Sequence, residues 1–178
     1  MKYSVALMLI TAALSSGCAA NVRKSSGENA RLAIATDSSR HIVMNLTGSE
    51  TAVTAGDWEQ FKGEWRGAMQ KAAVEAGVRY SPEETGSKLP SEPGTLVVVY
   101  VNDYRYISPG ARYELGVMTG NAYIESKATF SDLETAVALG ERSYNTSSST
   151  WQGVFSAMTE KQVQAICKEI VAQVRSPT

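Results

Sequence analysis

The sequence predicts an α+β domain, a two-layer sandwich in which a mostly antiparallel sheet of about four strands carries two helices on one face. Two long segments, roughly 57 to 76 and 150 to 175, place apolar residues at helical spacing. The remaining ordered stretches are shorter. They are dense in β-branched and aromatic residues, or they alternate apolar with polar side chains, as half-buried strands do.

The first helix is expected over about 57 to 76. Asp57 with Gln60 has the spacing of a capping box, and Gly77 is a natural C-terminal stop. Gly63 and Gly67 lie inside it and lower its helix propensity by about 1 kcal/mol each. Their spacing of four lets a neighbour approach closely, and a surface helix with tolerated glycines is the alternative. The apolar face comprises Trp58, Phe61, Trp65, Ala68, Met69, Ala72 and Ala76.

Four strands are expected, over residues 41–46, 95–107, 121–130 and 137–144. The second helix follows them and has an apolar stripe with its charged residues mostly elsewhere. Cys167 lies within that stripe, which predicts a buried and inert thiol. The stripe comprises Phe155, Met158, Val163, Ile166, Ile170, Val171 and Val174.

The N-terminal segment has the parts of a bacterial export signal. Lys2 supplies a positive charge, residues 5–14 form an uncharged apolar run, and small residues at 15–17 precede Cys18. The run is about half of what a membrane-spanning helix needs, so it predicts a cleaved signal rather than an anchor. A cysteine after small residues resembles the lipobox of bacterial lipoproteins, whose thiol is acylated. The end of an uncleaved or differently cleaved signal is the alternative.

These features divide the chain into a signal peptide at 1–17, a lipidated tether at 18–38 and a single α+β domain at 39–178. Removal of residues 1–17 leaves 161 of 178 residues, enough for one domain with its own core. The mature chain keeps 16 basic and 18 acidic side chains, a balance that argues against nucleic-acid binding. The lipid would be its contact with the membrane.

Little catalytic chemistry can be assembled from the sequence. His41 is the only histidine, it lies in an expected strand, and no G-x-S-x-G elbow is present. No metal-ligand spacing is recognisable, so neither a metal nor another cofactor is predicted. For an envelope hydrolase, Asp103, Glu114 and Asp132 are the only acids that can be nominated.

Tyrosines on one strand suggest a binding surface instead. Strict alternation sets Tyr100, Tyr104 and Tyr106 on one face with Asn102, and Tyr123 lies on the polar face of the next strand. If this face is exposed, it suits contact with protein or glycan, and loss of one tyrosine should leave folding nearly intact. Ordinary cross-strand pairing of aromatic residues is the alternative.

The loop at 108–120 is a second candidate contact site, since Val117 and Met118 stand between its glycines. An apolar pair that folds back on the core is the other interpretation. Met118 and its neighbour are therefore grouped with the tyrosines as candidate partner-binding residues.

The stretch from about 96 to 174 resembles small Gram-negative envelope lipoproteins grouped as a domain of unknown function. Gly110-Ala111-Arg112-Tyr113, the glycines from 116 to 120, the strand NAYIESKATF with Asp132, and the final amphipathic helix carry the resemblance. It implies a sheet-and-helix domain like that of the lipopolysaccharide-assembly lipoprotein or a curli-export-like domain. No catalytic residue comes with it, and Leu133 to Thr135 stand where the family has a glycine.

The sequence thus favours an outer-membrane lipoprotein, facing the periplasm, that binds an envelope protein as an accessory in assembly or export. Ala19 after the cysteine, rather than Asp, favours the outer membrane by resemblance to lipoprotein sorting signals. An envelope hydrolase and a glycan-binding or lipid-binding lipoprotein are the alternatives.

Overall fold

The computed structural model describes residues 22–24, 31–83, 92–107, 121–147 and 158–175. Its sheet has six strands in the order β1-β6-β5-β4-β2-β3. The strands are β1 (Val22–Lys24), β2 (His41–Gly48), β3 (Arg79–Pro82), β4 (Thr95–Arg105), β5 (Tyr123–Asp132) and β6 (Ala138–Ser147). The helices are the 3₁₀ turn η1 (Ser38–Arg40), α1 (Glu50–Val53), α2 (Trp58–Ala76) and α4 (Met158–Arg175).

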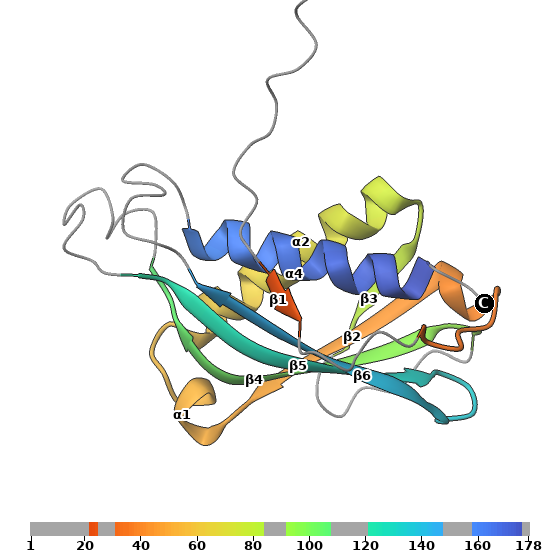
Figure 1. Ribbon diagram of the computed structural model, residues 1–178, viewed down its shortest axis with the longest axis horizontal. Coiled ribbons are helices and arrows are strands. Elements are labelled where there is room, and N and C mark those ends of the chain that lie inside the picture. The colour runs from red at the N-terminus through yellow and green to blue at the C-terminus, as the bar shows by residue number, and fades with distance from the viewer. Residues whose placement is uncertain (1–21, 25–30, 84–91, 108–120, 148–157, 176–178) are drawn as a thin grey trace, which may run out of the picture.

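The α+β class is confirmed, and α2 and α4 lie side by side on one face of the sheet (Figure 1). The expected strand number and pairing are wrong in part. The sheet is mixed, because β2 pairs in parallel with both β3 and β4, while the β1–β6, β4–β5 and β5–β6 pairs are antiparallel. The added strands are the short edges β1 and β3.

The parallel pairs follow from the chain order. β2 is followed by α1, by the 19-residue helix α2 and then by β3, and a helical connection between two strands returns the chain in the same direction beside the first of them. The sequence pattern of strand, helix and strand contains this crossover. The signal for β3 is weak, because this strand is only four residues long and lies next to a proline-bearing stretch.

The core lies between the sheet and the two long helices. Its largest fully buried side chains include Trp65 and Phe61 from α2, Phe130 and Tyr144 from the sheet, and Ile166 and Ile170 from α4. Cys167 is buried among them as a free thiol, in agreement with the expectation for it. Burial raises the pKa of this thiol, so it remains protonated at neutral pH.

The folded part of the chain begins earlier than residue 39. Leu32 and Ile34 are 3% and 1% exposed and belong to the core, and Val22 of β1 pairs with Thr146 of β6. A tether that extends to residue 38 is therefore too long. Leu32 and Ile34 alternate with exposed neighbours, as buried residues of an extended segment do. Two large apolar side chains are too few, however, to establish a period in the sequence.

The boundaries of α2 agree with expectation, but its N-terminus does not. Gly77 ends the helix in the left-handed conformation, with φ of 67°. Asp57 precedes the helix without capping it through its side chain. That carboxylate is instead bonded to a tyrosine of β4, so tertiary contact has replaced the local cap.

Candidate functional site

A β-bulge in β4 decides where the tyrosines lie. Val101 pairs with Ser126, but Asp103 pairs with Glu125, so Asn102 is an extra residue in the ladder. One extra residue reverses the alternation of side chains beyond it. Tyr100 consequently lies on the face away from the helices, whereas Tyr104 and Tyr106 pack against the core on the helix side.

The expectation that all three tyrosines share an exposed face is thus wrong. Tyr104 stacks on Phe61 and donates a hydrogen bond to Asp57 Oδ1 at 2.5 Å. Tyr106 makes a longer contact of 3.4 Å, from its hydroxyl to Glu64 Oε1. Burial raises the pKa of both phenols, and the neighbouring carboxylates raise it further, for Tyr106 to about 12. These tyrosines join β4 to α2.

The opposite face of the sheet, which we call the open face, carries polar and charged side chains of β4, β5 and β6. Tyr100 is 42% exposed there and pairs with Lys127 across the strands. Tyr123 is half-buried on the same face and pairs with Arg105. The open face further contains Asp103, Glu125, Glu141, Ser143 and Asn145.

Charges of both signs lie on the open face, although Asp103 and Glu125 are direct neighbours across the strands. Lys127 Nζ lies 2.7 Å from Glu141 Oε2, and the Tyr123 hydroxyl donates to Asp103 Oδ2 at 2.9 Å. This hydrogen bond raises the pKa of Tyr123, with a smaller effect from burial. Because both ion-pair side chains are about half exposed, the pair adds little stability and remains available to other polar groups. Such a surface can bind a polar or aromatic partner.

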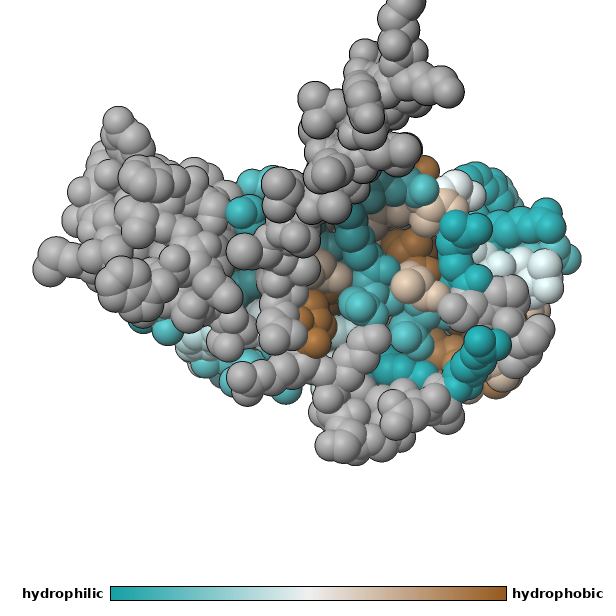
Figure 2. Space-filling view, turned by 45° about the horizontal axis from the view of Figure 1, so that its top comes forward, coloured by the Kyte–Doolittle hydropathy of each residue, from teal (hydrophilic) through white to brown (hydrophobic). Residues whose placement is uncertain are grey.

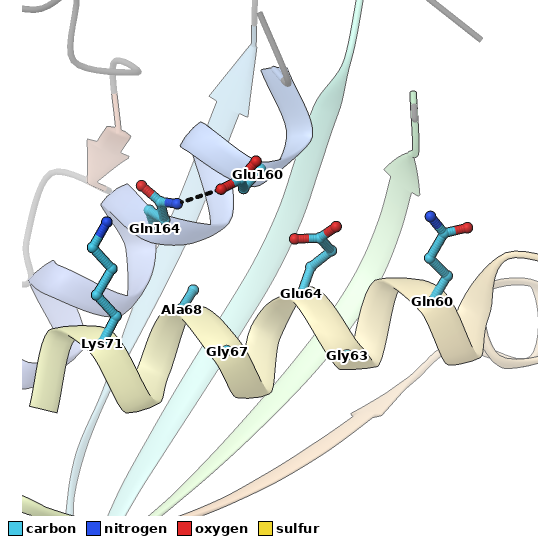
Figure 3. Close-up of a pocket in the computed structure, with 8 residues that line it drawn as sticks. All are labelled: Gln60, Gly63, Glu64, Gly67, Ala68, Lys71, Glu160 and Gln164. Atoms are coloured by element: carbon cyan, nitrogen blue, oxygen red, sulfur yellow. Dashed lines mark hydrogen bonds between the residues drawn. The ribbon is translucent and has the colours of Figure 1, made fainter. Parts of the chain in front are cut away.

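The helix layer contains a second candidate, a groove between α2 and α4. A hollow of about 540 Å³ is lined by Gln60, Gly63, Glu64, Gly67, Ala68 and Lys71 of α2 and by Glu160 and Gln164 of α4. Figure 3 shows the side chains of Gln60, Glu64 and Lys71 rising from α2 on the side of α4, with the glycines as gaps between them.

The groove continues along the helices. A second hollow of about 420 Å³ is lined by Ala72, Glu75, Ala76, Lys168, Val171, Ala172 and Arg175. Lys168 Nζ lies 3.0 Å from Glu75 Oε2. Viewed obliquely from the helix side, the molecule shows apolar residues between hydrophilic ones (Figure 2). The glycines at 63 and 67 were a sequence signal for this groove, but the contribution of α4 was not visible in the sequence.

The acids nominated for a hydrolase do not form a pair. Asp132 lies opposite Thr95 and Asp103 opposite Glu125, so eight residues of β4, roughly 25 Å, separate them. Asp132 accepts hydrogen bonds from Thr135 and Ser38. Those bonds to Thr135, with a further contribution from Ser38, lower the pKa of this carboxyl, which suits a turn anchor better than a general acid.

The structure brings together one nucleophile and base that sequence reasoning missed. His41 Nε2 lies 3.0 Å from Ser81 Oγ, because β2 and β3 are neighbours. His41 is 4% exposed, and its buried Nδ1 has no hydrogen-bond partner among the described residues. Burial lowers the pKa of His41, helped by Arg79. A catalytic pair needs a third group to orient the imidazole, and this pair lacks one in the described part of the chain.

The remaining predicted residues lie outside the described residues. These are the lipidation candidate Cys18, the loop residues Val117 and Met118, and Glu114 of the hydrolase alternative. Among the residues that the structure does describe, no three His, Cys, Asp or Glu side chains gather where a metal ion could bind. Within the same ranges, none of the helices is long and apolar enough to cross a membrane.

Comparison with known proteins gives structural neighbours only. No family model matches the sequence, and no curated protein is significantly similar to it. The PelC dodecamer from Paraburkholderia phytofirmans has a TM-score of 0.49 at 10% identity, over 89% of this chain and 99% of that one. A DUF330 protein from Xanthomonas campestris has a TM-score of 0.45 at 11% identity, over 74% and 81%. Similarity this distant says nothing about the chemistry or partners of this chain.

Proposed function

We propose that this chain is a lipid-anchored protein of the outer membrane whose domain works in the periplasm by binding an envelope protein, as an accessory in assembly or export. The observation that carries the binding role is the open face, where Tyr100 and Tyr123 lie among charged side chains of both signs. Tyrosine supplies contact area at low entropic cost together with a polar tip. Paired charges of both signs add specificity rather than raw affinity.

The anchoring part of the proposal rests on the short apolar run that ends in small residues and Cys18. Each buried methylene of an acyl chain contributes about 0.8 kcal/mol, so several chains hold a protein on a membrane. Cys18→Ser should move the protein to the soluble fraction of the envelope. Cys167→Ala is the matched control and should stay membrane-bound. A Cys18→Ser protein that sediments with membranes at high salt, with residues 1–17 removed, would contradict the anchor.

The choice of membrane has its own test. With Ala19 after the cysteine, the protein should sediment with outer-membrane markers on a density gradient. Ala19→Asp should move it toward the inner-membrane fraction. The same distribution for both proteins would show that this position does not sort the chain.

The binding part can be tested by photo-crosslinking in intact cells. A crosslinking amino acid at Tyr100 should form one reproducible adduct with an envelope protein, whereas the same amino acid at Glu134, exposed on the hairpin, should form none. Tyr100→Ala combined with Lys127→Ala should then abolish co-purification of that protein. Adducts of equal yield at both positions would speak against the open face as the binding surface.

The rival functions predict different outcomes. Saturable binding of envelope glycan by the purified protein, lost with Tyr100→Ala, would replace the protein partner with a carbohydrate. Turnover of an envelope polymer that is lost with Ser81→Ala would favour a hydrolase built on the 3.0 Å contact between His41 and Ser81. Either result would overturn the proposal of an accessory that binds protein.

A further inference from the structure

Two glycines in the middle of α2 are not explained by packing among the described residues. Gly63 and Gly67 each cost a helix about 1 kcal/mol relative to alanine. A Cβ atom built on either would meet no atom within 4 Å, so packing among the described residues does not require a glycine at either position. Both line the groove between α2 and α4. Missing side chains on an outer helix face let another backbone come close.

Charge divides this groove into two ends. Glu64 and Glu160 lie at the end near the helix N-termini. Lys71, Lys168 and Arg175 lie toward the other end, where Glu75 offsets one of them through its ion pair. Within the described residues Lys71 has no ion pair. The groove therefore has an acidic half and a basic half with small residues between them.

We propose that the occupant of this groove is a second copy of the chain, bound about a two-fold axis that passes midway between Gly67 and Ala68 of α2. This inference concerns the helix layer and goes beyond the proposed function of the open face. In such a dimer the two α2 helices pack against each other in antiparallel orientation. Each acidic half then meets the basic half of its partner, as an isologous interface requires.

The residue pairs that this axis creates are complementary in charge. Glu64 meets the partner's Lys71, and Gln60 meets the partner's Glu75. Gly67 lies beside the partner's Gly67, whereas Ala68 and Ala72, at 7% and 4% exposed, belong to the core of their own chain. The carboxylate of Glu64 thus faces a cation that has no ion pair among the described residues.

Other arrangements of the same surface are less favourable. A parallel copy would set Glu64 against the partner's Glu64 and Lys71 against the partner's Lys71, which costs free energy at both positions. A foreign helix would need the same charge order in reverse and small residues at the same spacing. The second copy satisfies both conditions because Glu64 and Lys71 exchange places about one point of α2, next to Gly67.

Disulfide formation by the full chain in intact cells tests the axis directly. In Gly67→Cys the two new thiols lie about 1.5 Å apart along the helix axis, and an efficient disulfide dimer is expected. Gly63→Cys is the matched control from the same groove. Its two copies lie roughly 13 Å apart along the axis, beyond the Cα separation of about 7 Å that a disulfide spans, so it should remain monomeric.

Charge reversal tests the pairing. In the Gly67→Cys background, Glu64→Lys alone or Lys71→Glu alone should lower the dimer yield roughly fivefold or more, and the two together should restore it. Since Glu64 also accepts a hydrogen bond from Tyr106, the single change at 64 perturbs the monomer, but the double variant carries the same perturbation. Restored yield therefore reports the interface and not the fold.

Three outcomes would overturn the proposal. They are equal dimer yields for Gly67→Cys and Gly63→Cys, a double reversal that leaves the yield low, and a disulfide between Gly67→Cys and a different protein. The last outcome would assign the groove to a foreign partner. None of these results depends on Tyr100 or on the lipid anchor, so failure here leaves the proposed function intact.

Discussion

The ring of Tyr104 lies parallel to the ring of Phe61, with centroids 4.1 Å apart and an interplanar angle of 6°. Trp58 packs at a tilt beside both rings, and the Tyr104 hydroxyl reaches Asp57 just before α2 begins. This contact joins the far end of β4 to the first turn of α2. It exists because the bulge at Asn102 turns Tyr104 toward the helices.

Removal of Tyr104 should therefore destabilise the fold. Tyr104→Ala should lower the free energy of unfolding by about 2 to 3 kcal/mol, since it removes the stacked ring, and Tyr104→Phe by about 1 kcal/mol, since it removes only the hydroxyl. Urea unfolding measures both. Tyr100→Ala on the open face is the control and should stay within about 0.5 kcal/mol. Equal losses for the two alanine variants would contradict the reversal of faces at the bulge.

The thiol of Cys167 should react slowly in the native protein. It is fully buried next to the backbone carbonyl of Trp65, so a reagent cannot reach it. Burial also raises its pKa, so little of the reactive thiolate is present at neutral pH. A thiol reagent should label it at a rate limited by unfolding, and at least about a hundredfold faster in denaturant. Similar rates in the two conditions would show that α4 does not pack as described.

Stability should depend on pH near neutrality through His41. Burial lowers its pKa in the folded state below the ordinary value of 6.5, so the unfolded chain binds the proton more tightly. The contribution of neutral His41 is complete above pH 6.5 and is lost as pH falls through the lower, folded pKa. His41→Gln can keep a hydrogen bond to Ser81 without titrating, and it should flatten the pH dependence of the unfolding free energy as the pH falls below 6.5. An unchanged slope would assign the dependence to other groups.

Gly140 should not tolerate a side chain. Its φ is 141°, and a Cβ atom would lie 2.7 Å from Leu32 Cδ2. Gly140→Ala should therefore cost about 1 to 3 kcal/mol of unfolding free energy. Gly56→Ala, where a Cβ meets nothing within 4 Å, should be nearly neutral. A neutral Gly140→Ala would mean that the segment containing Leu32 is not packed against the sheet in solution.

The elements that sequence analysis located correctly are those whose signals are local. The apolar period of α2, its stop at Gly77, the alternation in β5 and the stripe around Cys167 each depend on residues within about twenty positions. Part of the candidate site was also predicted from local alternation, since Tyr100 and Tyr123 both lie on the open face.

What the sequence by itself determined is thus the α+β class and the apolar faces of the two long helices, because helical periodicity depends only on residues within a single segment. The tertiary structure alone decided the bulge at Asn102, the burial of Leu32 and the contact of His41 with Ser81. It also decided that Asp57 bonds Tyr104 instead of capping α2. Each of these depends on the relative free energy of contacts between distant segments, and no local pattern records that balance.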